Sequence, residues 1–159
     1  MRSIGIVVGA LIMLMNPSTK MVCQEPTLSE LASQVDMTEE EFIFMSSVVE
    51  AESDRSDDIE GRILIALTII NRVEDPRFPD TITAVLTQRG QFATVRNGHS
   101  VVGRTDLSDK AVIQAFEWNA TEEDPNVLFF NCIGYAYGDP YGYVGGNYFA
   151  TLQIENEDT

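Results

Sequence analysis

Metal-ligating and redox-active side chains are scarce in this 159-residue sequence. It contains one histidine, His99, and two cysteines, Cys23 and Cys132, which lie far apart. Zinc hydrolases hold their metal with clusters of His, Cys and carboxylate side chains at short spacings, so we expect neither a metal site nor a cofactor. The two cysteines do not indicate a disulfide framework, and Cys132 is predicted to pack as a small apolar side chain.

Basic residues are also few, with ten Lys and Arg against 25 Asp and Glu and a net charge of −15. Proteins that bind nucleic acid neutralise its phosphates with basic patches, so nucleic acid is not an expected partner. One local exception is the segment between Asp80 and Asp106, which lacks acids and carries Arg89, Arg96 and Arg104. This excess of positive charge either forms a wall for an anionic substrate or pairs with acids elsewhere in the fold.

The sequence has no apolar run as long as an ordinary transmembrane helix. Its N-terminal run, residues 4–15, follows Arg2 and has the length of the apolar region of a signal peptide. We therefore predict an exported protein in which residues 1–23 are a signal peptide or an uncleaved anchor that contacts the membrane. Residues 24–37 are predicted to be a linker, residues 38–154 a single globular domain, and residues 155–159 an acidic tail.

The predicted domain is organised around residues 38–73. Thr38 and Glu41 form a capping box, which predicts a helix that begins near Glu39. Apolar residues at helical spacing form one broad face, and Glu50 falls at its C-terminal edge. Partial desolvation and the negative end of the helix dipole both favour the protonated form of a carboxyl there. Glu50 is therefore a candidate general acid, and the alternative is an ordinary solvated glutamate at a helix end.

Residues 59–73 predict a buried central helix, for which Asp57 and Glu60 resemble a second capping box. The acidic residues before it lack the alternating spacing and the glycine of a calcium loop, so a solvated helix start is the favoured interpretation. After two prolines, Asp80 or Thr81 can cap a short helix that runs through Leu86.

The last third of the chain predicts one more helix and two strands. Ser108 can cap a helix that runs to about residue 120, and residues 126–131 and 147–152 read as short strands. Residues 134–146 place four tyrosines among glycines, which predicts a surface loop. Its aromatic faces either stack on sugars or cover the edge of the core.

Three segments together resemble the cell-wall hydrolase family that contains the spore cortex-lytic enzymes. They are EAESDRSDDIEGRILIALTIINRVEDPRFPDTI at 50–82, GQF at 90–92 and GNYF at 146–149. The resemblance covers about residues 40–150 and implies a mainly helical α+β fold, a lysozyme-like single domain with a small β element. It also implies action on peptidoglycan, with Glu50 as the catalytic acid. The loop after Glu50 is about three residues longer than in the family, so the second acid of the motif maps loosely to Asp54, and Asn131-Cys132 stands where the family has Asn-Pro.

The leading functional hypothesis is a lytic transglycosylase that cleaves peptidoglycan of the spore cortex or the vegetative wall, as in germination. Glu50 would protonate the glycosidic oxygen and then, as a carboxylate, assist attack by the muramyl 6-hydroxyl, which removes the need for a second carboxylate. If Asp54 or Glu60 activated water instead, the enzyme would be a plain hydrolase. The alternatives are an N-acetylmuramoyl-L-alanine amidase, for which His99 and Cys132 are the candidate pair, and a non-catalytic wall-binding module.

The predicted substrate groove has Glu50 on one wall and amide and aromatic side chains on the other. Amides bind sugar hydroxyls and aromatic rings stack on sugar faces, and these residue types concentrate in two segments of the chain. The predicted substrate-binding residues are Asp54, Gln91, Phe92, Asn131, Tyr141, Tyr143 and Asn147.

Overall fold

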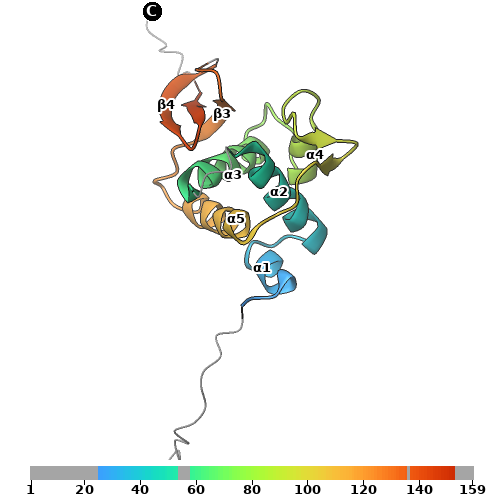
Figure 1. The fold of residues 1–159 in the computed structure, drawn as a ribbon. Coiled ribbons are helices and arrows are strands. Elements are labelled where there is room, and N and C mark those ends of the chain that lie inside the picture. The colour runs from blue at the N-terminus through green and yellow to red at the C-terminus, as the bar shows by residue number, and fades with distance from the viewer. Residues whose placement is uncertain (1–24, 54–57, 136, 153–159) are drawn as a thin grey trace, which may run out of the picture.

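The computed structural model describes residues 25–53, 58–135 and 137–152, which form five helices and two small sheets (Figure 1). The helices are α1 (Leu28–Gln34), α2 (Glu39–Glu52), α3 (Ile59–Glu74), α4 (Ile82–Thr87) and α5 (Asp106–Asn119). The strands are β1 (Val95–Arg96), β2 (His99–Ser100), β3 (Val127–Asn131), β4 (Asp139–Val144) and β5 (Asn147–Thr151). The mainly helical α+β architecture is confirmed. Asp54, the predicted signal peptide or anchor and the acidic tail lie outside the described residues.

Helix α3 is the centre of the core, as the apolar run 59–73 predicts. Its residues from Gly61 to Arg72 are buried with the exception of Ile63, and it packs against α2, α4, α5 and β3. Figure 1 shows the three-stranded sheet at one end of this helical body and α1 at the other. A charged side chain on α3 therefore has to find its polar partners inside the protein.

The helix starts follow from local capping. The predicted box at Thr38 and Glu41 is confirmed, because the Thr38 hydroxyl accepts from the Glu41 N–H and the Glu41 carboxylate accepts from the Thr38 N–H. The cap of α3 is Asp58, whose carboxylate accepts from the Glu60 N–H. The prediction of Ser108 as a cap is wrong by one turn, since α5 is capped by Thr105, with Ser108 at its third position.

The predicted linker at residues 24–37 is corrected for most of its length, because it contains α1. Thr27 and Glu30 form a capping box there, Ala32 is 2 % exposed, and Leu28 and Leu31 pack against the core. Helix α1 contacts α2 and α5. The spacing of these apolar side chains carried the helical signal, which Pro26 and the neighbouring polar residues obscured.

The larger sheet is antiparallel with the strand order β3-β5-β4. Strands β3 and β5 were predicted and are confirmed. The surface loop predicted at residues 134–146 is partly wrong, because β4 occupies its second half and pairs with β5 along Tyr143↔Tyr148 and Val144↔Asn147. Glycines and a proline favour a loop locally, whereas β4 is an edge strand that only its partner stabilises. Cys132 follows β3 and is exposed, contrary to prediction.

Two glycines allow the β4–β5 turn to rest on the start of α3. A Cβ atom added to Gly61 would lie 2.8 Å from the Cα of Gly145, and Gly145 has a positive φ of 52°. Such a distance is shorter than any ordinary contact, so the backbones meet at these positions only because neither residue has a side chain. This contact holds the aromatic sheet next to the end of α2.

Candidate functional site

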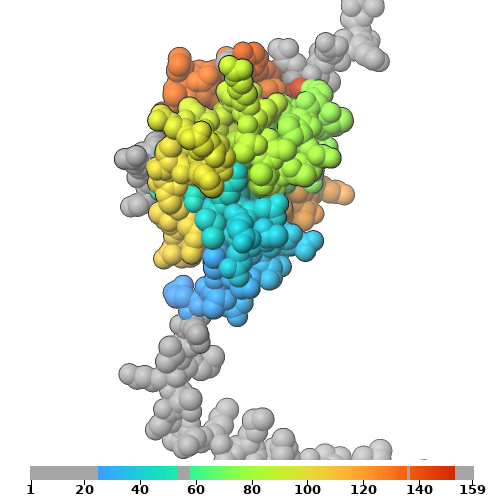
Figure 2. Space-filling view, turned by 90° about the vertical axis from the view of Figure 1, so that its right-hand side faces the viewer, coloured from blue at the N-terminus to red at the C-terminus, as the bar shows by residue number. Residues whose placement is uncertain are grey.

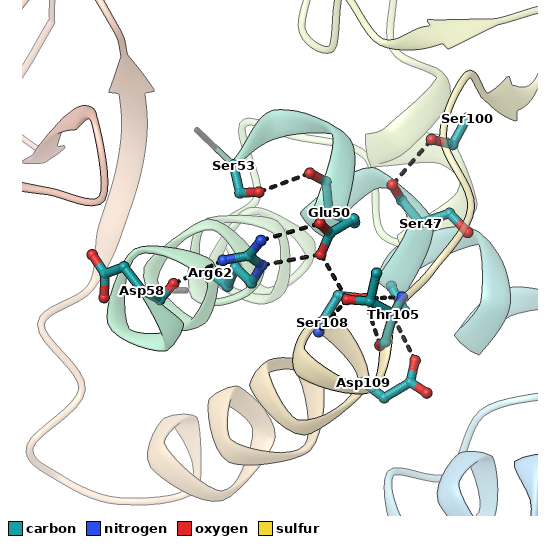
Figure 3. Close-up of polar contacts among 10 residues, drawn as sticks. Ser47, Glu50, Ser53, Asp58, Arg62, Ser100, Thr105, Ser108 and Asp109 are labelled. Carbon is teal, nitrogen blue, oxygen red and sulfur yellow. Dashed lines mark hydrogen bonds and ion pairs between the residues drawn. The ribbon is translucent and has the colours of Figure 1, made fainter. Parts of the chain in front are cut away.

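Glu50 lies in the last turn of α2 and is held by two side chains from other helices (Figure 3). Arg62 approaches it with two nitrogens, Nε at 3.0 Å from Oε2 and Nη2 at 3.1 Å from Oε1. The Thr105 hydroxyl donates to Oε2 at 2.8 Å. The Glu50 side chain is 11 % exposed and that of Arg62 is 3 % exposed. The carboxylate is therefore oriented by charge-assisted hydrogen bonds at the edge of the core.

The partners of Glu50 come from three helix ends that meet at this point. Glu50 is near the C-terminus of α2, Arg62 is in the first turns of α3, and Thr105 is the cap of α5 (Figure 3). Arg62 also donates from Nη1 to the carbonyl of Asp58 at 3.0 Å, which ties it to the start of its own helix. The sequence analysis did not identify Arg62 or Thr105 as site residues. The available signal for Arg62 was a charged residue directly before the mainly apolar run 63–70.

Buried polar side chains support Thr105 from below. The Ser46 and Ser108 hydroxyls lie 2.8 Å apart, and Ser46 donates to Asp109 Oδ1 at 2.7 Å. Ser108 accepts from the Thr105 N–H at 2.8 Å, and Asp109 forms an ion pair with Arg104. Ser46 and Ser108 are fully buried, so this network fixes the start of α5 and with it the hydroxyl that contacts Glu50.

The positive stretch between Asp80 and Asp106 is thus explained in part. Arg104 forms an ion pair with Asp109, so this arginine follows the alternative in which the positive charges pair with acids of the fold. Arg89 and Arg96 are exposed, and in the described part of the chain neither forms an ion pair. Figure 2 shows the segment from α4 to the β1–β2 hairpin, coloured green to yellow, between α2 in cyan and the sheet in orange.

The surroundings of Glu50 combine opposing electrostatic effects. Burial and the C-terminal end of α2 favour the protonated carboxyl, as the sequence indicated, but the Arg62 guanidinium favours the carboxylate. Arg62 therefore stabilises the carboxylate form of Glu50, which is the form that remains after an acid has transferred its proton. These contacts hold the Glu50 carboxyl in one position.

A cavity of about 440 Å³ lies against the outer face of the larger sheet. Its lining includes Gln91, Phe129, Asn131, Tyr135, Tyr137 and Tyr148, together with Arg72. The Tyr143 and Tyr148 rings lie 4.5 Å apart, and the Tyr135 ring meets the Tyr148 ring edge-on at 5.1 Å. The cavity lining therefore brings Gln91 and Asn131 together with part of the tyrosine-rich segment, whereas Glu50, Tyr141 and Tyr143, which the sequence analysis placed in the same groove, are not among its described lining residues.

Two of the predicted substrate-binding residues are buried. Phe92 is 4 % exposed and packs against Phe130, so it has no free face for a sugar and its predicted stacking role is corrected to core packing. Asn147 is 5 % exposed, and its amide donates to the carbonyl of Glu52 at 3.4 Å, which anchors β5 to the end of α2. Its predicted role in substrate binding needs an accessible side chain, so this role is corrected to a structural one.

The remaining predicted residues are placed as follows. Tyr141 and Tyr143 are 42 % and 60 % exposed on β4, and their sugar-binding role stays a prediction. Asp54 lies outside the described residues. Glu52, two residues after Glu50, accepts from the N–H and the hydroxyl of Thr94, and this contact fixes the segment after Gln91 to the end of α2.

The pair proposed for amidase chemistry is separate from Glu50. His99 in β2 and Cys132 after β3 are both exposed, and no hydrogen bond joins them within the described ranges. Among the residues that the structure describes, no three His, Cys, Asp or Glu side chains are grouped so that they could hold a metal ion. The helices described are all too short or too polar to cross a membrane.

Comparison with known proteins gives matches over about half of the chain. The profile of the cell wall hydrolase family matches residues 56–137. A spore cortex-lytic enzyme of Oceanobacillus iheyensis is 29 % identical over 86 residues, which are 54 % of this chain and 30 % of that protein. The spore cortex-lytic enzyme of Bacillus subtilis is 30 % identical over 78 residues, 48 % of this chain and 25 % of that protein. The matches thus span less than a third of these relatives.

Two solved structures share the fold. The catalytic domain of the Bacillus cereus SleB protein superimposes with a TM-score of 0.58 at 22 % identity, covering 72 % of this chain and 91 % of that domain. The catalytic domain of the germination-specific lytic transglycosylase SleB from Bacillus anthracis gives a TM-score of 0.61 at 22 % identity, covering 72 % and 96 %. With a family profile that covers more than half of its residues, this chain belongs to the cell wall hydrolase family.

Proposed function

We propose that this protein cleaves the glycan strands of peptidoglycan as a lytic transglycosylase, with Glu50 as the general acid and base. The observation that carries the proposal is the Glu50 carboxylate, 11 % exposed and held by Arg62 and Thr105 where three helix ends meet. Family membership supports it. So do the names of the similar proteins, which are spore cortex-lytic enzymes and a germination-specific lytic transglycosylase.

In the proposed reaction Glu50 first transfers its proton to the glycosidic oxygen while the bond from that oxygen to C1 of the muramyl residue breaks. The carboxylate that results is stabilised by the Arg62 guanidinium and the Thr105 hydroxyl. It then accepts the proton of the muramyl 6-hydroxyl as the oxygen of that group bonds to C1 and closes a 1,6-anhydro ring. The proton from the 6-hydroxyl restores the acid form of Glu50, the first proton stays on the released sugar hydroxyl, and no water is consumed.

We assign Arg62 and Thr105 as positioning residues in this scheme. They hold the Glu50 carboxyl in one orientation. A single residue that acts first as the acid and then as the base has to reach two different oxygens in turn, so its position relative to both must be fixed. Gln91, Asn131, Tyr141 and Tyr143 are proposed to bind the glycan through amide hydrogen bonds and ring stacking. Asp54 remains a proposed binding residue on the sequence evidence alone.

The proposal also covers location and substrate. A protein that acts on peptidoglycan has to reach the wall, which fits the N-terminal run of apolar residues as an export signal or anchor. We propose the cortex of the spore or the vegetative wall as the substrate. Digestion of purified cortex and of vegetative peptidoglycan, compared on one gel, distinguishes the two.

The central experiment is digestion of peptidoglycan by the wild type and by Glu50→Gln, with mass spectrometry of the products. We expect 1,6-anhydro-muramyl ends from the wild type and none from Glu50→Gln, whose side chain keeps its shape and lacks the proton. The matched control is Glu117→Gln, an exposed glutamate on α5, which should behave as the wild type.

Other product patterns would replace the mechanism. Reducing muramyl ends without the anhydro form would indicate a hydrolase, and Glu60→Gln, an exposed acid at the start of α3, would then test whether Glu60 activates the water. Release of stem peptides from intact glycan would indicate an amidase. Tight glycan binding by the wild type with no products at all would indicate a binding module.

A further inference from the structure

The second arginine of α3, Arg72, is buried without a carboxylate partner. It is 5 % exposed, and its single hydrogen bond among the described residues runs from Nε to the carbonyl of Leu128 at 2.8 Å. Its Nη1 atom is fully covered and has no acceptor in that part of the chain. A chain with 25 acids and ten bases could readily supply a partner, so this isolation calls for an explanation.

Aromatic rings take the place of a carboxylate around Arg72. Its guanidinium carbon lies 5.2 Å from the centre of the Phe78 ring, 5.7 Å from that of Phe92 and 6.0 Å from that of Phe129. Such rings stabilise a cation without neutralising it. Burial lowers the pKa of Arg72 to about 10, so the guanidinium is still charged at neutral pH.

A purely structural role accounts for part of this arrangement. Arg72 and Asn71 bind neighbouring carbonyls of β3, with Asn71 Nδ2 at 3.1 Å from the carbonyl of Val127. These bonds anchor β3 to α3. Of the three guanidinium nitrogens of Arg72, Nε is the one that takes part in this anchor. The charge and the other four N–H donors of the guanidinium are not needed for that anchor.

Arg72 also lines the cavity on the outer face of the sheet, beside Phe78 and Phe129. The same cavity carries the amides of Gln91 and Asn131 and the ring of Tyr137. A buried cation at the wall, amides and aromatic rings together suit a ligand that has a planar anionic group joined to amide bonds.

We propose that this cavity binds a free carboxylate of the peptide stem of peptidoglycan, with the Arg72 guanidinium as its counter-charge. This inference rests on the proposed function, because it names a subsite for the same substrate. With Nε bonded to the Leu128 carbonyl and Nη1 covered, Nη2 is the guanidinium nitrogen that can donate to a carboxylate oxygen in the cavity, and the amides of Gln91 and Asn131 can bind the peptide groups beside it. The local cation also offsets the repulsion that a strongly acidic protein exerts on an anionic peptide.

The reach of a peptide stem agrees with this placement. Arg62, which holds Glu50, and Arg72 lie ten residues apart on α3, which is about 15 Å along a helix. An extended peptide of four residues spans roughly 13 to 14 Å. The length of a peptide stem is therefore of the same order as the separation of the two arginines along α3.

The test measures binding, so that it does not depend on cleavage. The probes are a muramyl tetrapeptide with free carboxylates and the same compound with those carboxylates amidated. We expect the free acid to bind the wild type at least tenfold more tightly. We also expect Arg72→Met, which keeps most of the packing volume, to lose that preference. Arg77→Met, which removes an exposed arginine that pairs with Asp75, is the matched control and should retain it.

Equal binding of the two probes to the wild type would overturn the inference, and so would a preference that survives in folded Arg72→Met. If Arg72→Met does not fold, the wild type labelled with 15N-arginine decides. The Nε–H signal of Arg72 should shift with the free acid and stay in place with the amide, and no shift with either would refute the site. Glycan cleavage combined with equal binding of the two probes would refute this site and leave the proposed function standing. Tighter binding of the free acid without glycan cleavage would support this site and refute the proposed function.

Discussion

Removal of the Arg62 guanidinium tests how Glu50 is held. In Arg62→Met the Glu50 carboxylate, 11 % exposed, keeps the Thr105 hydroxyl as a donor and loses both bonds from Arg62. Deletion of one member of a buried ion pair destabilises a protein by about 3–5 kcal/mol, because the remaining charge is left without compensation. For a domain of this size 1 kcal/mol corresponds to about 2–4 °C. We therefore expect the melting midpoint to fall by at least about 6 °C.

The assay is a double-mutant cycle with Glu50→Gln, Arg62→Met and both together, followed by urea unfolding. Because each single change leaves a buried partner behind, we expect the double variant to lose less stability than the sum of the singles, by about 1.5–3 kcal/mol. The matched control is Arg77→Met, which breaks the Arg77–Asp75 pair, where the Arg77 side chain is 48 % exposed. It should leave the midpoint nearly unchanged. Additive effects in the Glu50 cycle would refute the view that these two side chains act as a buried pair.

Three more predictions follow from contacts around the site. Gly61→Ala should lower the free energy of unfolding by about 1–3 kcal/mol, because its Cβ would lie 2.8 Å from the Gly145 Cα. Gly103→Ala is the control and should leave stability unchanged, because no atom lies near the added Cβ. Thermal melts of the two variants test this difference. Thr105→Val should reduce kcat about tenfold, because Glu50 loses a hydrogen-bond donor at 2.8 Å. Thr105→Ser keeps the hydroxyl and should have the kcat of the wild type. An unchanged kcat in the valine variant would contradict the positioning role. Tyr143→Ala, at a ring 60 % exposed, should slow turnover of polymer with little change in the melting midpoint, and equal turnover would remove Tyr143 from the binding surface.

Those parts of the fold that local chemistry decides could be predicted from the sequence. The cap at Thr38 and the apolar run of α3 depend on neighbours within one or two turns, so their helices are correct to within a residue or two. The burial of Asn147 depends on contacts between segments more than 80 residues apart, such as Asn147 with Glu52 and Gly61 with Gly145. No local pattern encodes these contacts, and a glycine-rich stretch reads as a loop until its partner is known.

The candidate site likewise has a part that local sequence indicates and a part that depends on contacts between distant segments. Glu50 was predicted as a site residue from its place at the edge of an apolar helix face and from the resemblance to the family. Its partners Arg62 and Thr105 belong to helices whose packing angles the sequence does not state, and their chemistry is visible only once the three helix ends are placed together. Phe92 was misjudged for the related reason that an aromatic residue in a polar loop looks exposed, whereas β3 covers it with Phe130.

Helix α3 connects these observations, because it sets the distance between the two arginines that dominate the charge inside the protein. Arg62 is neutralised by Glu50 and Arg72 is surrounded by rings, although both are equally buried on one rigid helix. A buried cation paired with an acid fixes that acid in place, whereas a buried cation without one keeps its attraction for an external anion. In the proposed scheme, α3 therefore holds the reacting group and the recognition group for a peptide stem at a fixed separation.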